Sequence, residues 1–286
     1  MTAIVNVADD EVFHGLHVSP DLDSVTYALG GVNNVALGWG RADESYQTID
    51  ELARFGGDVW FRLGDRDLAT HIFRTEQLRA GRPLSAVTAD VRRAFGVDVE
   101  VLPVSDDPLR TVISALESGL ARDYAMQEWF VRERCEPEVV AVRFEGASTA
   151  KPAQGVLESL HGAETIVLCP SNPVISIGPL LEVTGIREVL VERRDRVVAV
   201  SPIVGGAPVK GPADRLMRPL GIEVSCVGIA RTYAAICSTL VIDTIDADRA
   251  PEIEAIGLRC TVTNTLMRDP GVAAELARHT LAAVAP

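Results

Sequence analysis

The chain has 286 residues, of which 47% are hydrophobic and 23% charged, a composition typical of a globular protein rather than a disordered one. Its 27 basic and 40 acidic residues give a net charge of −13, which disfavours a general nucleic-acid binder because phosphates attract positively charged proteins. No apolar run approaches the ~20 residues that span a bilayer, and the acidic start MTAIVNVADDE does not resemble a secretion signal, so we expect a cytoplasmic protein without membrane contact.

Short apolar runs and amphipathic runs alternate along the first half of the chain. An apolar run of this length predicts a strand, and apolar residues three or four positions apart predict a helix. The expected elements, in chain order, are a strand at Ala3–Val7, helices at Glu44–Phe55 and Ser85–Phe95 (with Ser85 as the N-cap), and strands at Val97–Leu102 and Val139–Phe144.

The second half has nearly continuous apolar strands, which are typical of a parallel sheet buried on both faces. We predict strands at Thr165–Cys169, Val197–Val200 and Thr239–Ile242, separated by helices at Gly185–Leu190, Pro212–Leu220 and Gly228–Cys237. This alternation predicts an α/β, Rossmann-like fold with a mostly parallel sheet and helices on both faces. We expect a single domain over residues 1–286, with a mainly helical lobe inserted at roughly residues 40–134.

Polar loops follow three of the predicted strands, at the end of a parallel sheet where ligands bind. Asp9 and Asp10 follow the first strand, the turn Pro170–Pro173 follows a later one, and the loop Ser201–Gly206 leads on to Lys210. Ser171 and Asn172 offer a hydroxyl and an amide to a phosphate or a base edge, and Lys210 offers a positive charge ahead of a helix. An ordinary proline-rich turn is the alternative for Ser171 and Asn172.

Acidic residues in two early segments are natural ligands for Mg²⁺, which binds carboxylates together with substrate phosphates. The candidates are Asp9 and Asp10, and less strongly Asp21. We expect Asp21 and Asp23 to lie on an extended segment and to face the same side, because they are two residues apart. The alternative is that these aspartates cap helices or turns.

Basic residues near Leu63–Asp67 offer a second kind of site. Arg62 or Arg66 carries a guanidinium that can bind an anion or stack on a ring, although caps and surface ion pairs explain the same run. His71 lies one helical turn after Asp67, a spacing more typical of a helix-face histidine bonded to a carboxylate than of a catalytic base.

Several other chemistries have no motif in the sequence. His14 and His17 lack the context of a zinc motif, and the five scattered cysteines form no C-x-x-C pair. We therefore expect reduced thiols rather than disulfides. The chain has no Walker A loop and no G-x-S-x-G nucleophile motif.

Long strings spread in one order along the chain resemble the 2-phospho-L-lactate transferase family of coenzyme F-420 biosynthesis. The two most specific strings are LGDRDLATH at Leu63–His71 and PSNPVISIGPLL at Pro170–Leu181. The others are NVADD at Asn6–Asp10, SPDLDS at Ser19–Ser24, GWG at Gly38–Gly40, LPVSDDP at Leu102–Pro108, VSPIVGGAPVKGPA at Val200–Ala213 and TLM at Thr265–Met267.

The resemblance implies a reaction and its partners. The ribityl hydroxyl of the deazaflavin precursor FO attacks a lactyl- or enolpyruvyl-bearing phosphorus of a guanosine diphospho-diester, and GMP leaves. Mg²⁺ is the expected cofactor and a homodimer the expected assembly. By motif, Asp23 and Arg62 contact the deazaflavin, Asp9 and Asp10 hold the metal, and Asp23 is the best candidate for the general base. Loop chemistry assigns Ser171, Asn172 and Lys210 to the guanosine nucleotide.

The chain departs from the family pattern at its start. The resemblance implies a strand and a G-G-x-G-x-x-K loop ahead of the NVADD segment, whereas this sequence begins at that second strand. We expect the absence of this phosphate-binding loop to impair nucleotide binding.

Two other functions compete with the transferase. A non-catalytic, nucleotide-sugar-binding regulator of the related gluconeogenesis-factor family is favoured by the absent loop, whereas the strings SPDLD and LGDRDLATH favour the transferase. A nicotinamide-dependent dehydrogenase is disfavoured because no G-x-G-x-x-G follows a predicted strand.

Overall fold

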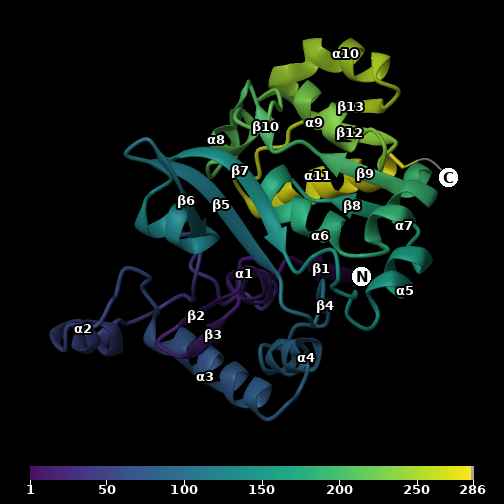
Figure 1. Cartoon of the computed structure of the whole chain (residues 1–286). Helices are drawn as coiled ribbons and strands as arrows, with labels where there is room; N and C mark the ends of the chain where they lie inside the picture. The colour runs from purple at the N-terminus through teal and green to yellow at the C-terminus, as the bar shows by residue number, and fades with distance from the viewer. Residues whose placement is uncertain (285–286) are drawn as a thin grey trace. The chain divides into compact units, whose positions relative to one another are not determined.

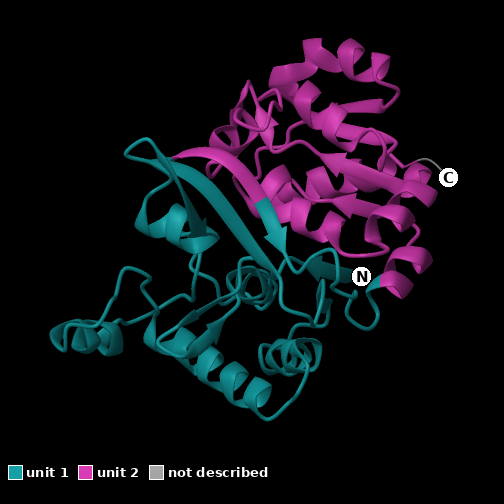
Figure 2. Ribbon diagram, in the orientation of Figure 1, with its two compact units in different colours: residues 1–137, 143–156 teal, residues 138–142, 157–286 magenta. Residues whose placement is uncertain are grey.

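The computed structural model describes residues 1–284, which divide into two compact units. The first unit comprises Met1–Pro137 and Arg143–Val156, and the second comprises Glu138–Val142 and the chain from Leu157 onward (Figure 2). The two units are described separately. Whether the chain is one domain with an inserted lobe at residues 40–134 stays a prediction; that stretch contains helices α2 to α4 and strands β4 to β6.

The first unit is built from short strands and four α-helices (Figure 1). Its elements are β1 (Thr2–Val5), β2 (Glu11–Phe13), β3 (Leu16–Val18), α1 (Pro20–Leu29), α2 (Gln47–Arg54), α3 (Asp65–Arg79), α4 (Leu84–Ala94), β4 (Glu100–Pro103), β5 (Arg110–Glu117), β6 (Leu120–Ala125) and η1 (Glu128–Arg132). Strand β7 (Glu138–Glu145) is divided between the two units.

Three strand pairs organise the first unit. Strands β1 and β4 are parallel, with Thr2 opposite Glu100 and Val5 opposite Pro103, and β5 and β6 form an antiparallel hairpin. Strands β2 and β3 form a second hairpin whose two-residue turn, His14 and Gly15, has φ angles of 53° and 77°. Positive φ at both turn positions matches the right-handed twist of the strands, and glycine adopts it without strain.

The second unit contains the remaining elements. From α5 onward they are α5 (Val156–Gly162), β8 (Ile166–Leu168), η2 (Pro173–Ile177), α6 (Gly178–Glu182), α7 (Ile186–Glu192), η3 (Arg194–Arg196), β9 (Val197–Val200), β10 (Ile203–Val204), β11 (Ala207–Pro208), α8 (Ala213–Met217), α9 (Cys226–Tyr233), β12 (Thr239–Asp243), η4 (Thr244–Arg249), α10 (Ala250–Ala255), β13 (Arg259–Thr263) and α11 (Pro270–Ala282).

A four-stranded parallel sheet in the order β13-β12-β9-β8 forms the centre of the second unit. Val198, Val200 and Val241 pack against Leu276 of α11, so this helix covers one face of the sheet. The intervening residues Val197 and Ala199 are also fully buried, so the opposite face is covered as well. This confirms the predicted α/β fold with a parallel sheet, and the strands at 165–169, 197–200 and 239–242 lie where the apolar runs predicted them.

Two local predictions in the first unit were wrong. The segment with Asp21 and Asp23 is not extended but forms the first turn of α1, with Pro20 at the first helical position. Proline fits there because its missing N–H would have no partner, and acidic residues there interact favourably with the helix dipole. Ser85 is not an N-cap: Pro83 holds that position, and the Ser85 amide and hydroxyl donate to Asp106 instead.

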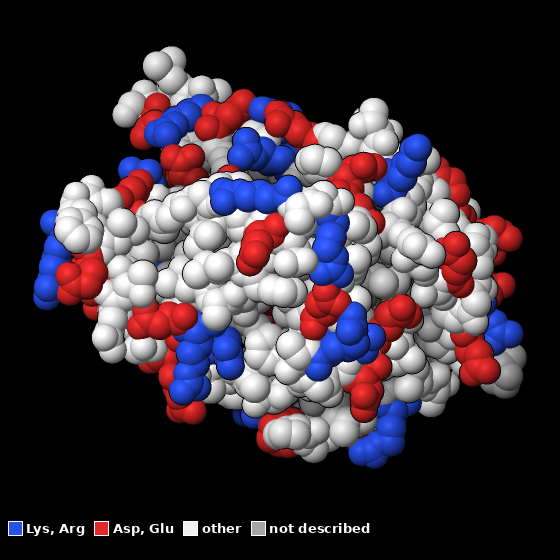
Figure 3. Space-filling view, turned by 90° about the horizontal axis from the view of Figure 1, so that it is seen from below, with Lys and Arg blue, Asp and Glu red and all other residues white. Residues whose placement is uncertain are grey.

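The surface mixes charges of both signs. Figure 3 shows acidic and basic side chains interspersed over the face that it presents, without a large patch of one sign. Many of these are short-range pairs, such as Arg54 with Glu51 and Arg278 with Glu275. Among the helices of the described residues, none has the length and apolar character needed to cross a membrane.

Helices α2 and α3 are held together by reciprocal caps. The Glu44 carboxylate accepts hydrogen bonds from the amides of Arg66 (2.6 Å) and Asp67 (3.2 Å) at the start of α3. The Asp65 carboxylate accepts from the amides of Gln47 and Thr48 (both 3.0 Å) at the start of α2. These bonds lower the pKa of Asp65, together with one from the Ser45 hydroxyl, which is the strongest of them. Asp65 of α3 therefore caps α2, and Glu44, from the segment just before α2, caps α3.

We predict that Gly64→Ala destabilises the protein by about 1 kcal/mol, the usual cost of losing a helix cap. A Cβ atom at Gly64 would lie 2.0 Å from Cγ of Glu44 and would push this side chain off α3. Because the substitution acts through Glu44, the double variant with Glu44→Ala should be no less stable than Glu44→Ala alone. Urea unfolding measures this; Gly162→Ala, whose Cβ meets nothing within 4 Å, is the matched control. Additive effects would contradict the prediction.

Candidate functional site

A group of three buried or half-buried carboxylates lies just after β1, and we call Asp9, Asp10 and Asp21 the acidic centre. The amide nitrogen of Asn6 donates to Oδ2 of Asp9 (3.1 Å) and to Oδ2 of Asp21 (2.9 Å). The side-chain oxygen Oδ1 of Asn6 accepts from the backbone amide of Ala8 (2.9 Å), and this bond sets the orientation of the Asn6 side chain. One amide group therefore bridges the turn after β1 and the first turn of α1.

Asp10 is held by the β2–β3 hairpin and by the residue that follows it. Its Oδ2 atom lies 2.9 Å from Nε2 of His17 in β3 and accepts from the Ser19 hydroxyl at 2.6 Å. Ser19 stands at the N-cap position of α1 but makes no cap bond with its side chain. The Ser19 hydroxyl therefore donates to Asp10, and it does not accept a hydrogen bond from the first amides of α1.

The acidic centre is electrostatically unfavourable when no cation is bound. Burial raises the pKa of Asp9 well above its usual range, and the neighbouring Asp21 raises it further. Burial also raises the pKa of Asp21 to about 6, with a further contribution from Asp10. The pKa of Asp10 is raised by burial as well, although His17 and Ser19 oppose the shift. Like charges held close together in a buried place favour protonation or a bound cation.

Two oxygens of the acidic centre are without a hydrogen-bond partner. Oδ1 of Asp9 and Oδ1 of Asp10 are both buried, and neither makes a bond with any described residue. Buried polar atoms are nearly always satisfied, so an exception calls for an explanation such as an ion. Carboxylate oxygens are the ligands that Mg²⁺ prefers, and the residues present therefore fit this metal.

Asp23 belongs to a different cluster, between α1 and α3, in which it forms an ion pair with Arg74. Both of its carboxylate oxygens accept from the guanidinium of Arg74, with Nη1 to Oδ2 at 3.1 Å and Nη2 bound to Oδ1. The exposed fraction of the Asp23 and Arg74 side chains is only 7% and 2%. Both carboxylate oxygens of Asp23 are therefore engaged inside the fold, and its role as the general base stays a prediction.

The same cluster includes His71 and Asp67. Nη1 of Arg74 lies 3.3 Å from Nδ1 of His71, and a guanidinium can only donate, so Nδ1 accepts and the proton sits on Nε2. That nitrogen faces Asp67 at 3.5 Å, and the Tyr27 hydroxyl donates to Asp67 at 2.5 Å. Burial opposes the charge on Asp67, but the bonds from His71 and Tyr27 outweigh it and lower its pKa.

Asp23, Asp67 and His71 could hold a metal by position, since their ligand atoms lie within 4.8 Å of one another. Arg74 and Tyr27 already neutralise and bond these groups. The three carboxylates of the acidic centre do not each place an oxygen within that distance of one another, and their role in holding a metal stays a prediction. His71 is a buried helix histidine that lies 3.5 Å from Asp67, close to the carboxylate that its spacing indicated.

Arg62 lies on the surface of the same unit. Its Nη2 atom donates to Asp50 (2.9 Å), and its guanidinium stacks on the ring of Tyr46, 4.8 Å from the centroid. Asp23, the other residue expected to contact the deazaflavin, is bound by Arg74 instead of facing Arg62. Arg62 thus keeps an accessible guanidinium, and its role toward a ligand stays a prediction.

The second unit contains the other expected residues. Oδ1 of Asn172 accepts from the amides of Val174 (2.9 Å) and Ile175 (3.3 Å), so this side chain caps η2. Ser171 is half-buried beside it, and Lys210 is exposed ahead of α8. Their roles toward a nucleotide stay predictions.

Asp243 and Asp246, which the sequence did not single out, organise the loops at the carboxyl edge of the second unit's sheet. Asp243 accepts from the amides of Ile245 (3.0 Å) and Thr265 (2.7 Å). Burial would raise its pKa, but these bonds outweigh it and lower the pKa. Asp246 accepts from the amide of Gly205 (2.9 Å), which holds the glycine turn between β10 and β11.

Sequence reasoning also missed Asn6, His17, Ser19 and Arg74 in the first unit. A signal existed for Arg74, because it lies seven residues after Asp67 and so falls on the same face of a helix. The Ser-Pro start of α1 likewise marks a helix, which would have separated Asp21 from Asp23. No sequence signal singles out His17, since only the hairpin brings it to Asp10.

Comparison with known proteins identifies the family of the chain. The family model "2-phospho-L-lactate transferase CofD" matches residues 1–259, and the chain belongs to this family. Proteins named phosphoenolpyruvate transferase are similar over nearly the whole chain. The one from Streptomyces griseus is 45% identical over 98% of this chain and 89% of its own length, and the one from Streptomyces coelicolor is 43% identical over the same shares.

The fold also resembles that of a solved structure. Protein BH3568 from Bacillus halodurans, described as a member of the UPF0052 family, superposes with a TM-score of 0.60 at 16% identity, over 98% of this chain and 91% of the other. This likeness concerns the fold alone. The family and the relatives together make the chain an enzyme of the 2-phospho-L-lactate transferase type, and they support the expected place in coenzyme F-420 biosynthesis.

We predict that Asp23→Asn and Arg74→Met each lower the free energy of unfolding by about 3–5 kcal/mol, because each leaves a buried charge without its partner. The double variant should cost less than the sum of the two. Urea unfolding measures all three, and Glu275→Gln, which breaks the exposed pair with Arg278, is the control with an expected cost below about 1 kcal/mol. If Asp23→Asn and Arg74→Met each cost no more than the control variant, the prediction of a buried ion pair would be contradicted.

Asp243→Asn should lose stability in a pH-dependent way. An amide has one acceptor oxygen, so at neutral pH it leaves one buried N–H unpaired at a cost of about 1–3 kcal/mol. The Asp243 pKa is lowered by folding, so its stabilisation is fully present above the unfolded pKa near 3.8 and is lost as pH falls through the folded pKa. The difference from the unaltered protein should therefore shrink below about pH 4. Urea unfolding from pH 3 to 7, with exposed Asp248→Asn as control, tests this; a difference independent of pH would refute it.

Proposed function

We propose that the protein transfers a phosphoenolpyruvyl group, or in the alternative a phospholactyl group, from a guanosine diphospho-diester to the ribityl hydroxyl of the deazaflavin FO, with release of GMP. Membership of the transferase family supports the reaction type, and the name of the most similar relatives supports the enolpyruvyl donor. The observation that carries the proposal is the acidic centre, whose two buried and unbonded carboxylate oxygens suit a reaction on a diphosphate.

The proposed reaction is a substitution at phosphorus. The hydroxyl oxygen of FO forms a bond to the phosphorus that bears the three-carbon acid, and the bond from that phosphorus to the oxygen of the GMP portion breaks. The hydroxyl proton passes to a base or to solvent, and GMP leaves with the electron pair of the broken bond. Such a reaction needs little covalent participation by the protein, so in-line positioning and charge neutralisation dominate.

Asp9 and Asp10 would hold Mg²⁺, with Asp21 close enough to add to the negative field. The metal supplies positive charge to the diphosphate oxygens as the leaving group departs. Asn6 keeps Asp9 and Asp21 together, and His17 and Ser19 fix the orientation of Asp10. These neighbours preorganise the carboxylates before the substrate arrives.

The other expected residues take proposed roles that follow their contacts. We assign Asp23 to positioning, because its bonds to Arg74 fix the start of α1 and hence Asp21. Arg62 offers its exposed guanidinium to the acceptor, and Ser171, Asn172 and Lys210 offer polar groups to the guanosine side. Dimer formation, which the family resemblance implies, completes the proposal, and light scattering tests it.

The alternative function, a non-catalytic nucleotide-sugar-binding regulator, is not supported by the relatives, because they are named as transferases. The UPF0052 likeness bears on the fold alone.

Removing the carboxylates of the acidic centre should abolish most of the transfer. We expect Asp9→Asn and Asp10→Asn each to lower GMP release by roughly 100-fold, the usual loss when one electrostatic stabiliser of a transition state is removed. The assay supplies FO, the enolpyruvyl or lactyl donor and Mg²⁺, and follows GMP and the FO diester by chromatography. Asp248→Asn, an exposed aspartate of the second unit, is the control and should keep full activity.

The dependence of activity on Mg²⁺ concentration tells whether Asp10 binds the metal or only stabilises the fold. Excess Mg²⁺ should partly restore Asp10→Asn, and a chelator should stop the unaltered enzyme reversibly. No GMP release by the folded protein with either donor would overturn the proposed function. Full activity of both variants would overturn the role of the acidic centre.

A further inference from the structure

An open hollow lies at the amino edge of the second unit's parallel sheet, the edge opposite to the one where α/β proteins bind their main ligand. It has a volume of about 670 Å³ and lies where η3 leads into β9 and where β12 and β13 begin. Three arginines and a buried serine, Arg194, Arg196, Arg259 and Ser238, line it. We call it the arginine hollow.

Two of its guanidinium groups are fixed in place by neutral oxygens. Arg259 donates through Nε to the Thr239 hydroxyl (3.1 Å) and through Nη2 to the Ser238 hydroxyl (3.3 Å). Arg194 donates to the carbonyl oxygens of Ala234 (2.8 Å) and Gly257 (3.0 Å). In each case Nη1 is left without a protein partner among the described residues, so the group is held in position and still able to donate.

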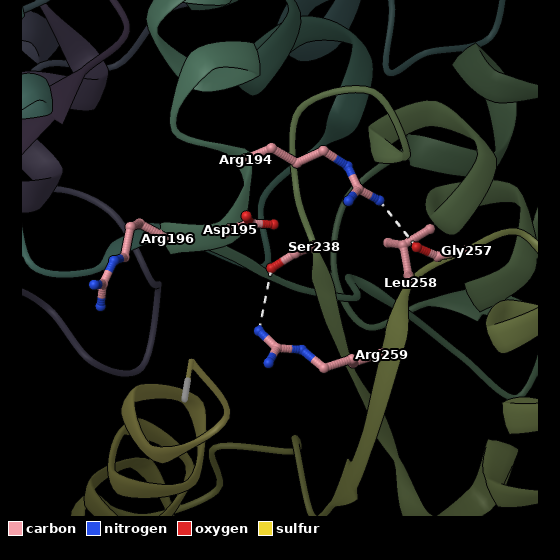
Figure 4. A pocket seen from close by; sticks show the side chains of 7 residues that line it. All are labelled: Arg194, Asp195, Arg196, Ser238, Gly257, Leu258 and Arg259. Atoms are coloured by element: carbon pink, nitrogen blue, oxygen red, sulfur yellow. Dashed lines mark hydrogen bonds between the residues drawn. The ribbon is translucent and has the colours of Figure 1, made fainter. Parts of the chain in front are cut away.

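Arg196 forms the other side of the hollow. Figure 4 shows Arg259 beside Ser238, Arg194 turned toward Gly257, and Arg196 apart from both, with its guanidinium directed away from Ser238. The Arg196 guanidinium has no hydrogen bond or ion pair with any residue that the structure describes. It also lines an adjoining hollow of about 520 Å³, so that it stands between the two.

The three arginines of the hollow differ from several others of this unit in having no carboxylate partner. Arg187, Arg231 and Arg249 each pair with a glutamate. None of the three arginines of the hollow has a carboxylate oxygen within ion-pair distance in the described part of the chain, and the lining contains a single acid, Asp195. In a protein with a net charge of −13, three unpaired guanidinium groups around one hollow make a local positive field.

We propose that the arginine hollow binds a small phosphate-bearing anion. A guanidinium presents a planar fork that matches phosphate oxygens, and the fixed groups of Arg194 and Arg259 lose little freedom on binding. Diphosphate is the first candidate, because each of its two phosphate groups can accept hydrogen bonds from a guanidinium. The site shares no residue with the acidic centre or with the loops at the carboxyl edge.

The test measures binding alone and requires no catalysis, so a failure of the proposed transferase activity would leave its result intact. Isothermal titration of the full chain uses inorganic diphosphate, inorganic phosphate and GMP as separate probes. The variants are Arg196→Gln/Arg259→Gln and its charge-keeping partner Arg196→Lys/Arg259→Lys. Arg187→Gln, an arginine of the same unit outside the hollow, is the matched control. All of these side chains are exposed, and circular dichroism checks that each variant folds.

We expect saturable diphosphate binding that the glutamine pair weakens by about tenfold or more, since each charged hydrogen bond contributes about 1.5–3 kcal/mol. The affinity of the lysine double variant for diphosphate should lie between those of the glutamine double variant and the unaltered protein. Arg187→Gln should bind diphosphate as tightly as the unaltered protein. A parallel loss of GMP binding would identify nucleotides as a source of the phosphate, and unchanged GMP binding would assign the hollow to inorganic anions. No saturation up to millimolar diphosphate, or a smaller loss in the glutamine pair, overturns the proposal.

Discussion

The first unit depends on how it accommodates buried negative charge. Asp9, Asp10, Asp21, Asp23 and Asp67 all lie within the first 70 residues and within one unit. Asp23 forms an ion pair with Arg74, and Asp67 accepts from the Tyr27 hydroxyl beside His71. Asp9 and Asp21 share the Asn6 amide, and Asp10 binds His17 and Ser19 and also feels the charge of Arg74. The same short stretch of chain therefore builds one cluster around an ion pair and one in which three carboxylates lie close together.

This division has a physical logic. A buried ion pair such as Asp23 with Arg74 adds little net stability compared with apolar packing, but it fixes one arrangement of two helices. That arrangement sets the first turn of α1, and with it the place of Asp21 beside Asn6. The acidic centre is then held by hydrogen bonds from neutral Asn6 and Ser19 and by His17, while burial and the neighbouring carboxylates raise the pKa of its aspartates. Asp23 and the aspartates of the acidic centre therefore differ more in their hydrogen-bond partners than in how deeply they are buried.

The second unit separates its two sheet edges in a comparable way. At the carboxyl edge, Asp243 and Asp246 accept backbone amides and shape the loops that carry the expected nucleotide residues. At the amino edge, arginines donate to carbonyl and hydroxyl oxygens and keep their charge unpaired. Parallel strands make this possible, because all their carboxyl ends meet at one edge and all their amino ends at the other. The acidic side chains therefore lie at one edge of the sheet and the arginines at the other.

By itself the sequence determined the parallel sheet of the second unit, since continuous apolar runs such as Val197–Val200 have no place except between two covered faces. It also indicated that Asp9 and Asp10 follow a strand, and its motifs carried the family resemblance. It did not determine which aspartate meets which partner. Asp21 and Asp23 read alike in sequence, but a helix turns them in different directions, one to Asn6 and one to Arg74. Only the tertiary structure decided this, because those partners lie 15 and 51 residues away along the chain and hydrogen bonds of that span depend on the packing of whole elements.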